Sequence, residues 1–237
     1  MEKIGGNMKS IAIITARGGS KRIPRKNIKE FCGKPIIAYS IEAALNSKLF
    51  DEVMVSTDDK EIAEIAREYG ADVPFMRSEA TSNDYATTAD VLLEVLNEYK
   101  KLGREFDYHC CIYPTAPFVT AEKLREAMSL ILSSDADCVA PYAQFSVPPQ
   151  WRAEIDDNGY VAFKEPDLLV VRSQDLPSMY YDPGQFYMYN TRNYVANNGR
   201  ITNRMSAIKV SEMEVQDIDN IDDWKMAEIK YKMMISK

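Results

Sequence analysis

Short apolar runs alternate with segments of helical periodicity up to about residue 141, and this rhythm is the strongest constraint on the fold. The helical segments carry apolar residues at three- and four-residue intervals. Such alternation predicts βαβ units and a mostly parallel sheet with helices on both faces, an α/β fold of the Rossmann-like type. The apolar runs predict strands at residues 10–16, 51–57, 71–76, 107–114 and 136–141.

The rhythm breaks at Tyr142. From there to about Asn198, prolines and aromatic residues replace the helical patterns, which indicates a β-rich insertion. This insertion has much apolar surface that it would bury poorly alone, so it is a candidate dimer arm. Sheet-like segments return at residues 206–210 and 214–219, and residues 221–234 predict a closing helix.

At 237 residues the chain can form one large domain, which we place at residues 9–237 after a loose leader at residues 1–8. Its net charge of −7 argues against binding to nucleic acid or to anionic membranes. No apolar run approaches membrane-spanning length. The four cysteines lack the spacing of metal ligands and indicate reduced thiols, so we expect a cytoplasmic protein.

A basic loop with two adjacent glycines, "ARGGSKRIPRKN" at residues 16–27, follows the first predicted strand. Over residues 17–34, seven lysines and arginines stand against a single acid. Gly18 and Gly19 let the backbone turn sharply and approach a ligand, and Ser20 adds a hydroxyl donor. Ligands of such sheets bind outside the carboxyl ends of the strands, where this loop lies. A solvated basic surface is the alternative, but the glycines and the strand end favour a cradle for several phosphates.

Two carboxylates, Asp217 and Asp219, stand two residues apart in a segment predicted to be extended. At this spacing both side chains project from one face, while Ile218 turns toward the core. Converging carboxylates suit Mg²⁺, which takes hard oxygen ligands and completes its shell with water and phosphate oxygens. The alternative is helix capping, because Asp219 lies just before a helix expected to begin near Ile221.

The loop "ARGGSKRIPRKN" followed by "GKPIIAYSIEAA" resembles the signature of the CMP-sialic acid synthetase family, the cytidylyltransferases that activate nonulosonic acids. The segments "STDDKEIAEIAREYGADVPFMR", "PTAP" and "DIDNIDDW" are similar to the same family in the same order, so the resemblance covers nearly the whole chain. One departure is Thr15, where the family usually has proline. The resemblance implies the nucleotide-diphospho-sugar transferase type of α/β fold, a Mg²⁺ cofactor and a homodimer.

The resemblance also implies residue roles. Lys21 would be the cation that stabilises charge as pyrophosphate leaves, and Asp217 and Asp219 would be the metal ligands. Together with Arg17 these residues form the expected catalytic set. The expected nucleotide-binding residues are Ala16, Arg17, Gly18, Gly19, Ser20, Lys21, Lys26, Asn27, Arg77, Ser82, Asn83 and Thr87. Helix capping is a competing explanation for the last three of these residues.

Three further polar residues are expected to have structural roles. Asp58 and Asp59 lie between a predicted strand and a predicted helix, and capping explains them without a role in the site. His109, the only histidine, lies in a predicted buried strand, where a core histidine is the simpler interpretation than a catalytic base.

Sugar-binding residues are expected after the fourth predicted strand and in the Pro-Gly turn of "YYDPGQFYMYN". Relatives that act on N-acetylneuraminate typically carry glutamine where this chain has Tyr113. This departure and the turn resemble the pseudaminic acid cytidylyltransferase branch. A turn followed by an edge strand is the competing explanation for the second segment. The candidate sugar-binding residues are Tyr113, Thr115, Gln185 and Phe186.

The expected reaction is transfer of CMP from CTP to the anomeric hydroxyl of a nonulosonic acid, with pseudaminic acid as the first candidate and pyrophosphate as the second product. Such a transfer needs positioning and charge neutralisation more than covalent chemistry. N-acetylneuraminate and legionaminate are the nearest alternative substrates. More distant alternatives are a sugar-1-phosphate nucleotidyltransferase and a non-catalytic nucleotide-binding module, although a passive binder needs no carboxylate pair facing the phosphates.

Overall fold

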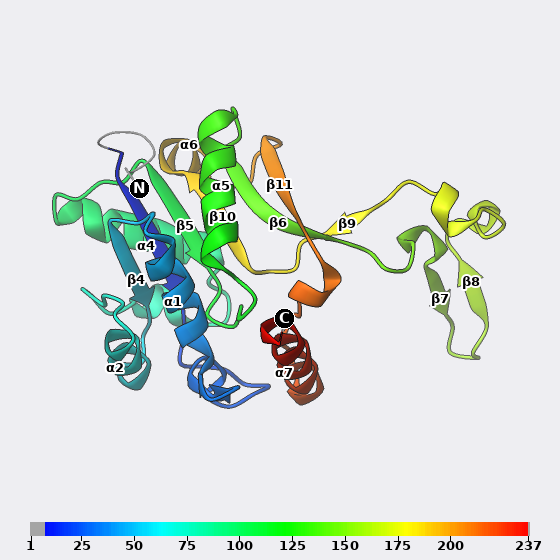
Figure 1. The fold of residues 1–237 in the computed structure, drawn as a ribbon, viewed down its shortest axis with the longest axis horizontal. Helices are drawn as coiled ribbons and strands as arrows, with labels where there is room; N and C mark the ends of the chain where they lie inside the picture. Colours follow the sequence, from blue (N-terminus) through cyan, green and yellow to red (C-terminus); the bar gives the residue numbers. More distant parts are fainter. Residues whose placement is uncertain (1–7, 237) are drawn as a thin grey trace.

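The computed structural model describes residues 8–236 and has a seven-stranded sheet at its centre (Figure 1). The strands are β1 (Ser10–Thr15), β4 (Glu52–Ser56), β5 (Tyr108–Ile112), β6 (Cys138–Gln144), β9 (Tyr180–Tyr181), β10 (Phe186–Asn190) and β11 (Met205–Val210). They lie in the order β11-β6-β10-β5-β1-β4, with β9 paired to β6. Strand β1 is parallel to β4 and β5, and β11 is parallel to β6, whereas β10 runs antiparallel between β5 and β6. The predicted mostly parallel sheet is therefore confirmed.

Helices cover both faces of the sheet, as predicted. Successive residues of β1 belong to different cores, since Ala12 lies in one and Ile11 in the other. The first core contains residues of α1, α2 and α5, and the second contains residues of α4 and α6. The helices are α1 (Ile36–Ser47), α2 (Lys60–Glu68), α3 (Glu79–Ser82), α4 (Thr88–Lys101), α5 (Ala121–Ser133), α6 (Thr191–Ala196) and α7 (Ile221–Ile235). Within the part of the chain that the structure describes, none of them has the length and apolarity needed to cross a bilayer.

A third, smaller core attaches α7 to the rest of the domain. The Phe31 ring meets the Trp224 ring edge-on, with centroids 5.6 Å apart. Phe31 lies in β2 (Glu30–Phe31), which pairs with β3 (Lys34–Pro35) just before α1. Ile218 is buried in the same cluster, as expected. This packing fixes the segment that carries the two aspartates on either side of Ile218.

Residues 145–179 form an arm that extends away from the sheet (Figure 1). The arm contains a hairpin of β7 (Ala153–Ile155) and β8 (Val161–Phe163). The expected insertion at residues 142–198 was therefore too wide. Its first residues belong to β6 and its last third contains the central strand β10 and α6, because the alternating apolar residues of "FYMYN" complete the sheet. Short 3-10 helices are η1 (Lys26–Ile28), η2 (Pro149–Trp151), η3 (Pro166–Leu168), η4 (Ser173–Asp175) and η5 (Glu212–Glu214).

Two other predictions of extended structure were wrong. Residues 71–76 make one isolated bridge, between Asp72 and Met54, because Pro74 lacks the N–H that a longer ladder requires. Residues 214–219 form no strand, because Glu214 ends η5 and the residues after it turn Ile218 into the third core instead of the sheet. The expected leader falls outside the described residues, except Met8, which packs against the first core.

Candidate active site

A cavity of about 490 Å³ opens at the carboxyl ends of β1 and β5, where ligands of open α/β sheets bind. Three segments line it: the basic loop after β1, the residues from Arg77 to Val91 around α3 and the start of α4, and the residues that follow β5. The volume falls within the range of small-molecule sites. Among the described residues, the lining consists of Thr15, Arg17, Ser20, Lys21, Arg22, Ile23, Lys26, Asn27, Arg77, Thr81, Asn83, Asp84, Ala86, Thr87, Thr88, Val91, Tyr113, Pro114 and Thr115.

Most of the residues expected from the sequence meet at this cavity. Those that line it are Arg17, Ser20, Lys21, Lys26, Asn27, Arg77, Asn83, Thr87, Tyr113 and Thr115. Those that do not are Ala16, Gly18, Gly19, Ser82, Gln185, Phe186, Asp217 and Asp219. The first three of this second group still belong to the basic loop and shape it, while the others have different positions, described below.

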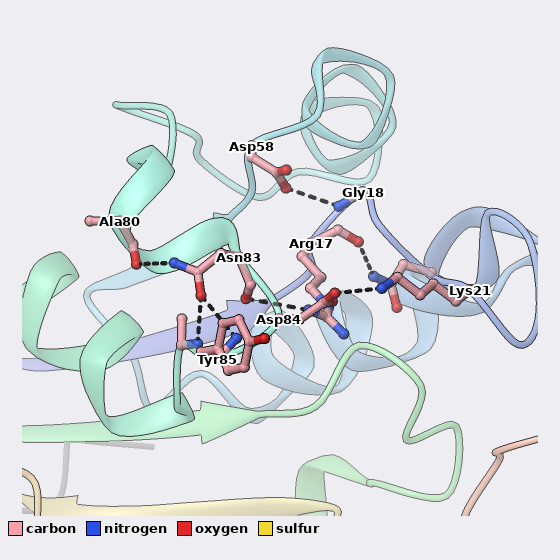
Figure 2. A network of polar contacts seen from close by, with 10 residues as sticks. Arg17, Gly18, Lys21, Asp58, Ala80, Asn83, Asp84 and Tyr85 are labelled. Atoms are coloured by element: carbon pink, nitrogen blue, oxygen red, sulfur yellow. Dashed lines mark hydrogen bonds and ion pairs between the residues drawn. The ribbon is translucent and has the colours of Figure 1, made fainter.

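Two cations of the basic loop converge on one carboxylate across the cavity (Figure 2). The Arg17 Nη1 atom donates to Asp84 Oδ1 at 2.9 Å, and the Lys21 Nζ atom donates to Asp84 Oδ2 at 2.5 Å. Hydrogen bonding from Lys21 is the main reason that the pKa of Asp84 lies below its usual value. An anion that enters the cavity therefore has to compete with Asp84 for both cations.

Asn27 supports the loop from inside. Its side chain is buried, and its Nδ2 atom donates to the Arg17 carbonyl at 2.8 Å. The side-chain amide of this expected nucleotide-binding residue thus holds the backbone beside Arg17. Lys26, the preceding residue, donates from Nζ to the Ile218 carbonyl at 2.8 Å, which joins the loop to the segment before α7.

Arg77 is a buried cation at the edge of the sheet. Its Nε atom donates to Ser56 Oγ at 3.0 Å and its Nη2 atom to the Ser56 carbonyl at 2.6 Å, and burial lowers its pKa. Arg77 follows no strand, contrary to the sequence prediction. It is held beside the end of β4 because its backbone N–H donates to the Thr57 carbonyl.

The segment between α3 and α4 contains the helix cap that the competing explanation predicted for Thr87. Thr87 caps α4 in a reciprocal box with Asp90. Asn83 Oδ1 accepts from the backbone N–H groups of Tyr85 and Ala86 at 2.9 and 3.0 Å (Figure 2). Ser82 donates to the Ser78 carbonyl and does not reach the cavity. The capped turn presents the Asp84 carboxylate to the basic loop.

Tyr113, which directly follows β5, also lines the cavity. Its backbone N–H donates to the Gln185 carbonyl at 2.9 Å, and its hydroxyl lies 3.5 Å from Thr88 Oγ1. Burial raises the pKa of the Tyr113 phenol, so it stays protonated and can donate a hydrogen bond to a ligand.

Gln185 and Phe186 lie outside the lining of this cavity, and their expected sugar contacts stay predictions. Gln185 is buried, and its Nε2 atom donates to the Glu214 carbonyl at 2.6 Å. Phe186 is completely buried in the first core, because the strand alternation of β10 turns it toward α5. Through this hydrogen bond, Gln185 connects the start of β10 to the segment that leads to Asp217.

The two aspartates lie next to the cavity and not in its lining. The Asp219 carboxylate pairs with Arg22 at 2.7 Å, and both Arg22 and Lys26 line the cavity. Asp219 does not cap α7, since Asn220 accepts hydrogen bonds from the N–H groups of Asp222 and Asp223. Burial, followed by repulsion from Asp219, raises the pKa of Asp217. Two neighbouring carboxylates supply the hard oxygen ligands that a divalent cation prefers.

Comparison with known proteins shows the family of the chain. A family model described as cytidylyltransferase matches residues 11–231. The chain belongs to this family. It is 38% identical over 226 residues to the pseudaminic acid cytidylyltransferase of Campylobacter jejuni, covering 95% of this chain and 97% of the relative. It is 34% identical over 229 residues to the CMP-N,N'-diacetyllegionaminic acid synthase of Legionella pneumophila, covering 93% of this chain and 95% of that protein.

A solved structure shares the fold of this cytidylyltransferase. CMP:2-keto-3-deoxy-manno-octonic acid synthetase complexed with CTP superposes with a TM-score of 0.69 at 18% sequence identity, covering 97% of this chain and all of that one. The expected nucleotidyltransferase fold is thereby confirmed.

Sequence reasoning missed Asp84 and Thr88 as residues of this cytidylyltransferase's cavity. Asp84 and Thr88 stand in a polar stretch that reads as helix capping, and capping patterns give no sign of which side chain points away from the helix. Arg22 is one of several cations in the loop. Only the folded chain shows that it pairs with Asp219, 197 positions away.

Proposed function

We propose that this cytidylyltransferase moves CMP from CTP to the anomeric hydroxyl of a nonulosonic acid, with pseudaminic acid as the substrate, and releases pyrophosphate. The observation that carries the proposal is the convergence of Arg17, Lys21 and Arg77 on one cavity in a chain whose net charge is −7. A local excess of cations in an acidic protein favours a small polyanion over a nucleic acid. The 38% identity to a protein named for pseudaminic acid supports the choice of sugar.

The loop side chains would neutralise the triphosphate. Arg17 and Lys21 exchange the Asp84 carboxylate for phosphate oxygens, and Ser20 offers a hydroxyl donor from the same turn. Holding the α-phosphate and the sugar hydroxyl in line replaces a bimolecular encounter by a positioned one. Charge that develops on the departing pyrophosphate is then stabilised by fixed cations.

Sugar binding is assigned to Tyr113 and Thr115, which line the cavity after β5. The Tyr113 phenol and the Thr115 hydroxyl can both donate hydrogen bonds to acylamino or hydroxyl groups. Asp84 is the only carboxylate in the lining among the described residues, and its lowered pKa makes it a weak base. We therefore assign it no proton transfer.

Asp217 and Asp219 are the residues that would hold Mg²⁺. Their hard carboxylate oxygens fit this ion. Among the described residues, no three or more side chains of histidine, cysteine, aspartate or glutamate are grouped so that they could hold a metal. A two-carboxylate set leaves coordination positions for phosphate oxygens and water. When bound, the ion would act as a Lewis acid on the phosphates. The contact of Lys26 with the Ile218 carbonyl would keep both aspartates beside the basic loop.

The direct test is pyrophosphate release with CTP and Mg²⁺, with pseudaminate, N-acetylneuraminate and N,N'-diacetyllegionaminate offered in parallel. Turnover with pseudaminate, at a kcat/KM at least about tenfold above the other two, is the expected result. A preference for another sugar would retain the chemistry and overturn the assignment of the sugar. CTP binding without turnover of any sugar would indicate a passive nucleotide-binding protein.

We further propose that the arm at residues 145–179 mediates homodimer formation. It exposes apolar side chains that a monomer leaves in water, among them Ile155, Val161 and Val170. Sedimentation should show a dimer at micromolar concentration. Replacing Val161 and Val170 by serine should shift it toward monomer, whereas the same change at Val195 and Ile201, exposed outside the arm, should not. A monomeric unaltered protein would exclude this assignment.

We also place the protein in the cytoplasm, where CTP is synthesised. The four cysteines are free thiols, as expected in a reducing compartment. Fractionation of the source cells should recover the activity with cytoplasmic markers. Recovery in a periplasmic or secreted fraction would contradict this placement.

A further inference from the structure

Two adjacent acids at the start of α2 hold the basic loop at two points. Asp58 Oδ1 accepts the Gly18 backbone N–H at 2.9 Å (Figure 2). Asp59 accepts both terminal nitrogens of Arg25, at 2.5 Å from Nη1 and 3.0 Å from Nη2. Gly18 and Arg25 bracket the stretch that carries Lys21, so the two acids fix both sides of the turn that faces the cavity.

The second contact is more than a surface ion pair. The Asp59 side chain is only 22% exposed, and the bidentate geometry with Arg25 is the strongest form of this interaction. Hydrogen bonding from Arg25 is the main cause that lowers the pKa of Asp59 to about 2. Glu61 accepts from the same guanidinium at 2.5 Å.

The backbone of the loop depends on these partners. Arg25 has φ 55° and ψ 30°, which is a left-handed conformation. This conformation is unfavourable for a residue other than glycine, so it persists only where surrounding contacts stabilise it. Gly18 lies so close to Asp59 that a Cβ atom would come within 2.8 Å of the Asp59 Oδ2 atom. The loop therefore has its present course because it packs on the start of α2.

We propose that Asp58 and Asp59 are positioning residues for polyphosphate binding. A loop with five cations between residues 17 and 26 repels itself, and two fixed acids behind it hold its charged side chains toward the cavity. The inference rests on the proposed function, since it takes the triphosphate of CTP as the ligand of this loop. It gives a role in the reaction to two residues that the sequence indicated only as helix caps.

Capping and positioning can be separated experimentally, because Asp59 does both. Its Oδ1 atom also accepts the Ile62 N–H at 3.0 Å and caps α2. Asparagine caps helices about as well as aspartate, whereas it cannot provide the charge that binds Arg25 bidentately. Asp59→Asn thus keeps the helix and weakens the support of the loop.

The experiment measures CTP KM, sugar KM, kcat and Tm for Asp59→Asn, Asp58→Asn and Arg25→Lys in the full chain. For Asp59→Asn we expect a CTP KM raised about fivefold to twentyfold, with sugar KM within twofold and Tm within a few degrees of the unaltered protein. Loss of binding that is shared by ground and transition states raises KM and spares kcat. Glu64→Gln is the matched control, an exposed acid on α2 without a polar contact among the described residues.

A double-mutant cycle on CTP KM identifies the pathway. If Asp59 acts through Arg25, Asp59→Asn combined with Arg25→Lys should raise KM no more than the worse single change. Full additivity of the two changes in CTP KM would overturn the inference while leaving the proposed function intact. The same would follow if Asp59→Asn and Asp58→Asn both had the CTP KM of Glu64→Gln. Equal increases in CTP and sugar KM with a fall in Tm would show a structural role only. An unaltered protein that does not bind CTP would overturn the proposed function and the inference together.

Discussion

The Arg17 guanidinium and the Asp84 carboxylate meet in the lining of the cavity, with Nη1 and Oδ1 2.9 Å apart. One residue comes from the loop after β1 and the other from the turn before α4, 67 positions later. Lys21 adds a second ion pair to the same carboxylate. The cations proposed to bind phosphates thus have an internal anion as their partner, and CTP has to displace it.

Replacing Asp84 by asparagine should therefore tighten CTP binding. Two partly exposed ion pairs would be lost as competitors, and pairs of this kind are weak, so we expect a CTP Kd about threefold to tenfold lower in titration calorimetry at low salt. The difference from the unaltered protein should shrink at high ionic strength. Glu79→Gln, a nearby exposed acid on α3, is the control and should bind CTP normally. Weaker binding by Asp84→Asn would show that Asp84 orients the cations instead of competing for them.

Asp217→Asn should separate nucleotide binding from turnover. The basic loop is untouched, so CTP binding stays measurable, while loss of a proposed Mg²⁺ ligand should lower kcat by more than about tenfold and raise the Mg²⁺ concentration needed for half the maximal rate. Asp222→Asn, a change of an exposed acid in the first turn of α7 whose carboxylate pairs with Lys225, serves as control. An unchanged Mg²⁺ dependence in Asp217→Asn would refute the metal assignment.

Gly18→Ala should destabilise the protein, and Gly19→Ala should not. The new Cβ atom at Gly18 meets Asp59 at 2.8 Å, whereas one at Gly19 meets nothing within 4 Å. Forcing an atom into a packed place costs about 1–3 kcal/mol, which lowers Tm by several degrees in a domain of this size. Thermal unfolding followed by circular dichroism measures both variants. Equal Tm values would contradict the close packing of the loop against α2.

His109 should make the protein less stable in mild acid. It is fully buried, with Nδ1 3.0 Å from Thr191 Oγ1, and burial lowers its pKa from 6.5 to about 3. Between these pH values the unfolded chain binds a proton that the folded chain does not, so stability falls as pH falls, by at most about 1.4 kcal/mol per pH unit. Urea unfolding of the protein and of His109→Gln across pH 4–7 should show a stability difference that narrows in acid. A constant difference would mean that His109 titrates alike in both states.

Local patterns of the sequence were enough to predict the sheet, the helices on its two faces and the location of the basic loop. Residues 71–76 and 214–219 are the informative failures. Both look extended, but an extended segment joins a sheet only where it can pair with a neighbouring strand. Pro74 prevents a longer ladder in the first segment, and Ile218 packs into the third core in the second. β10 was also hidden inside the expected insertion, since its place between β5 and β6 follows from long-range pairing.

By itself the sequence determined the chemistry that is present: a cluster of cations at a strand end, an aspartate pair two residues apart, and the motifs of a cytidylyltransferase. Only the tertiary structure decided which side chains face one another. It paired Asp84 with Arg17 and Asp59 with Arg25, and it turned Gln185 toward Glu214 and away from the cavity. The physical reason is that strand ends and helix starts are set by local spacing, whereas the partner of a charged side chain depends on how distant segments pack.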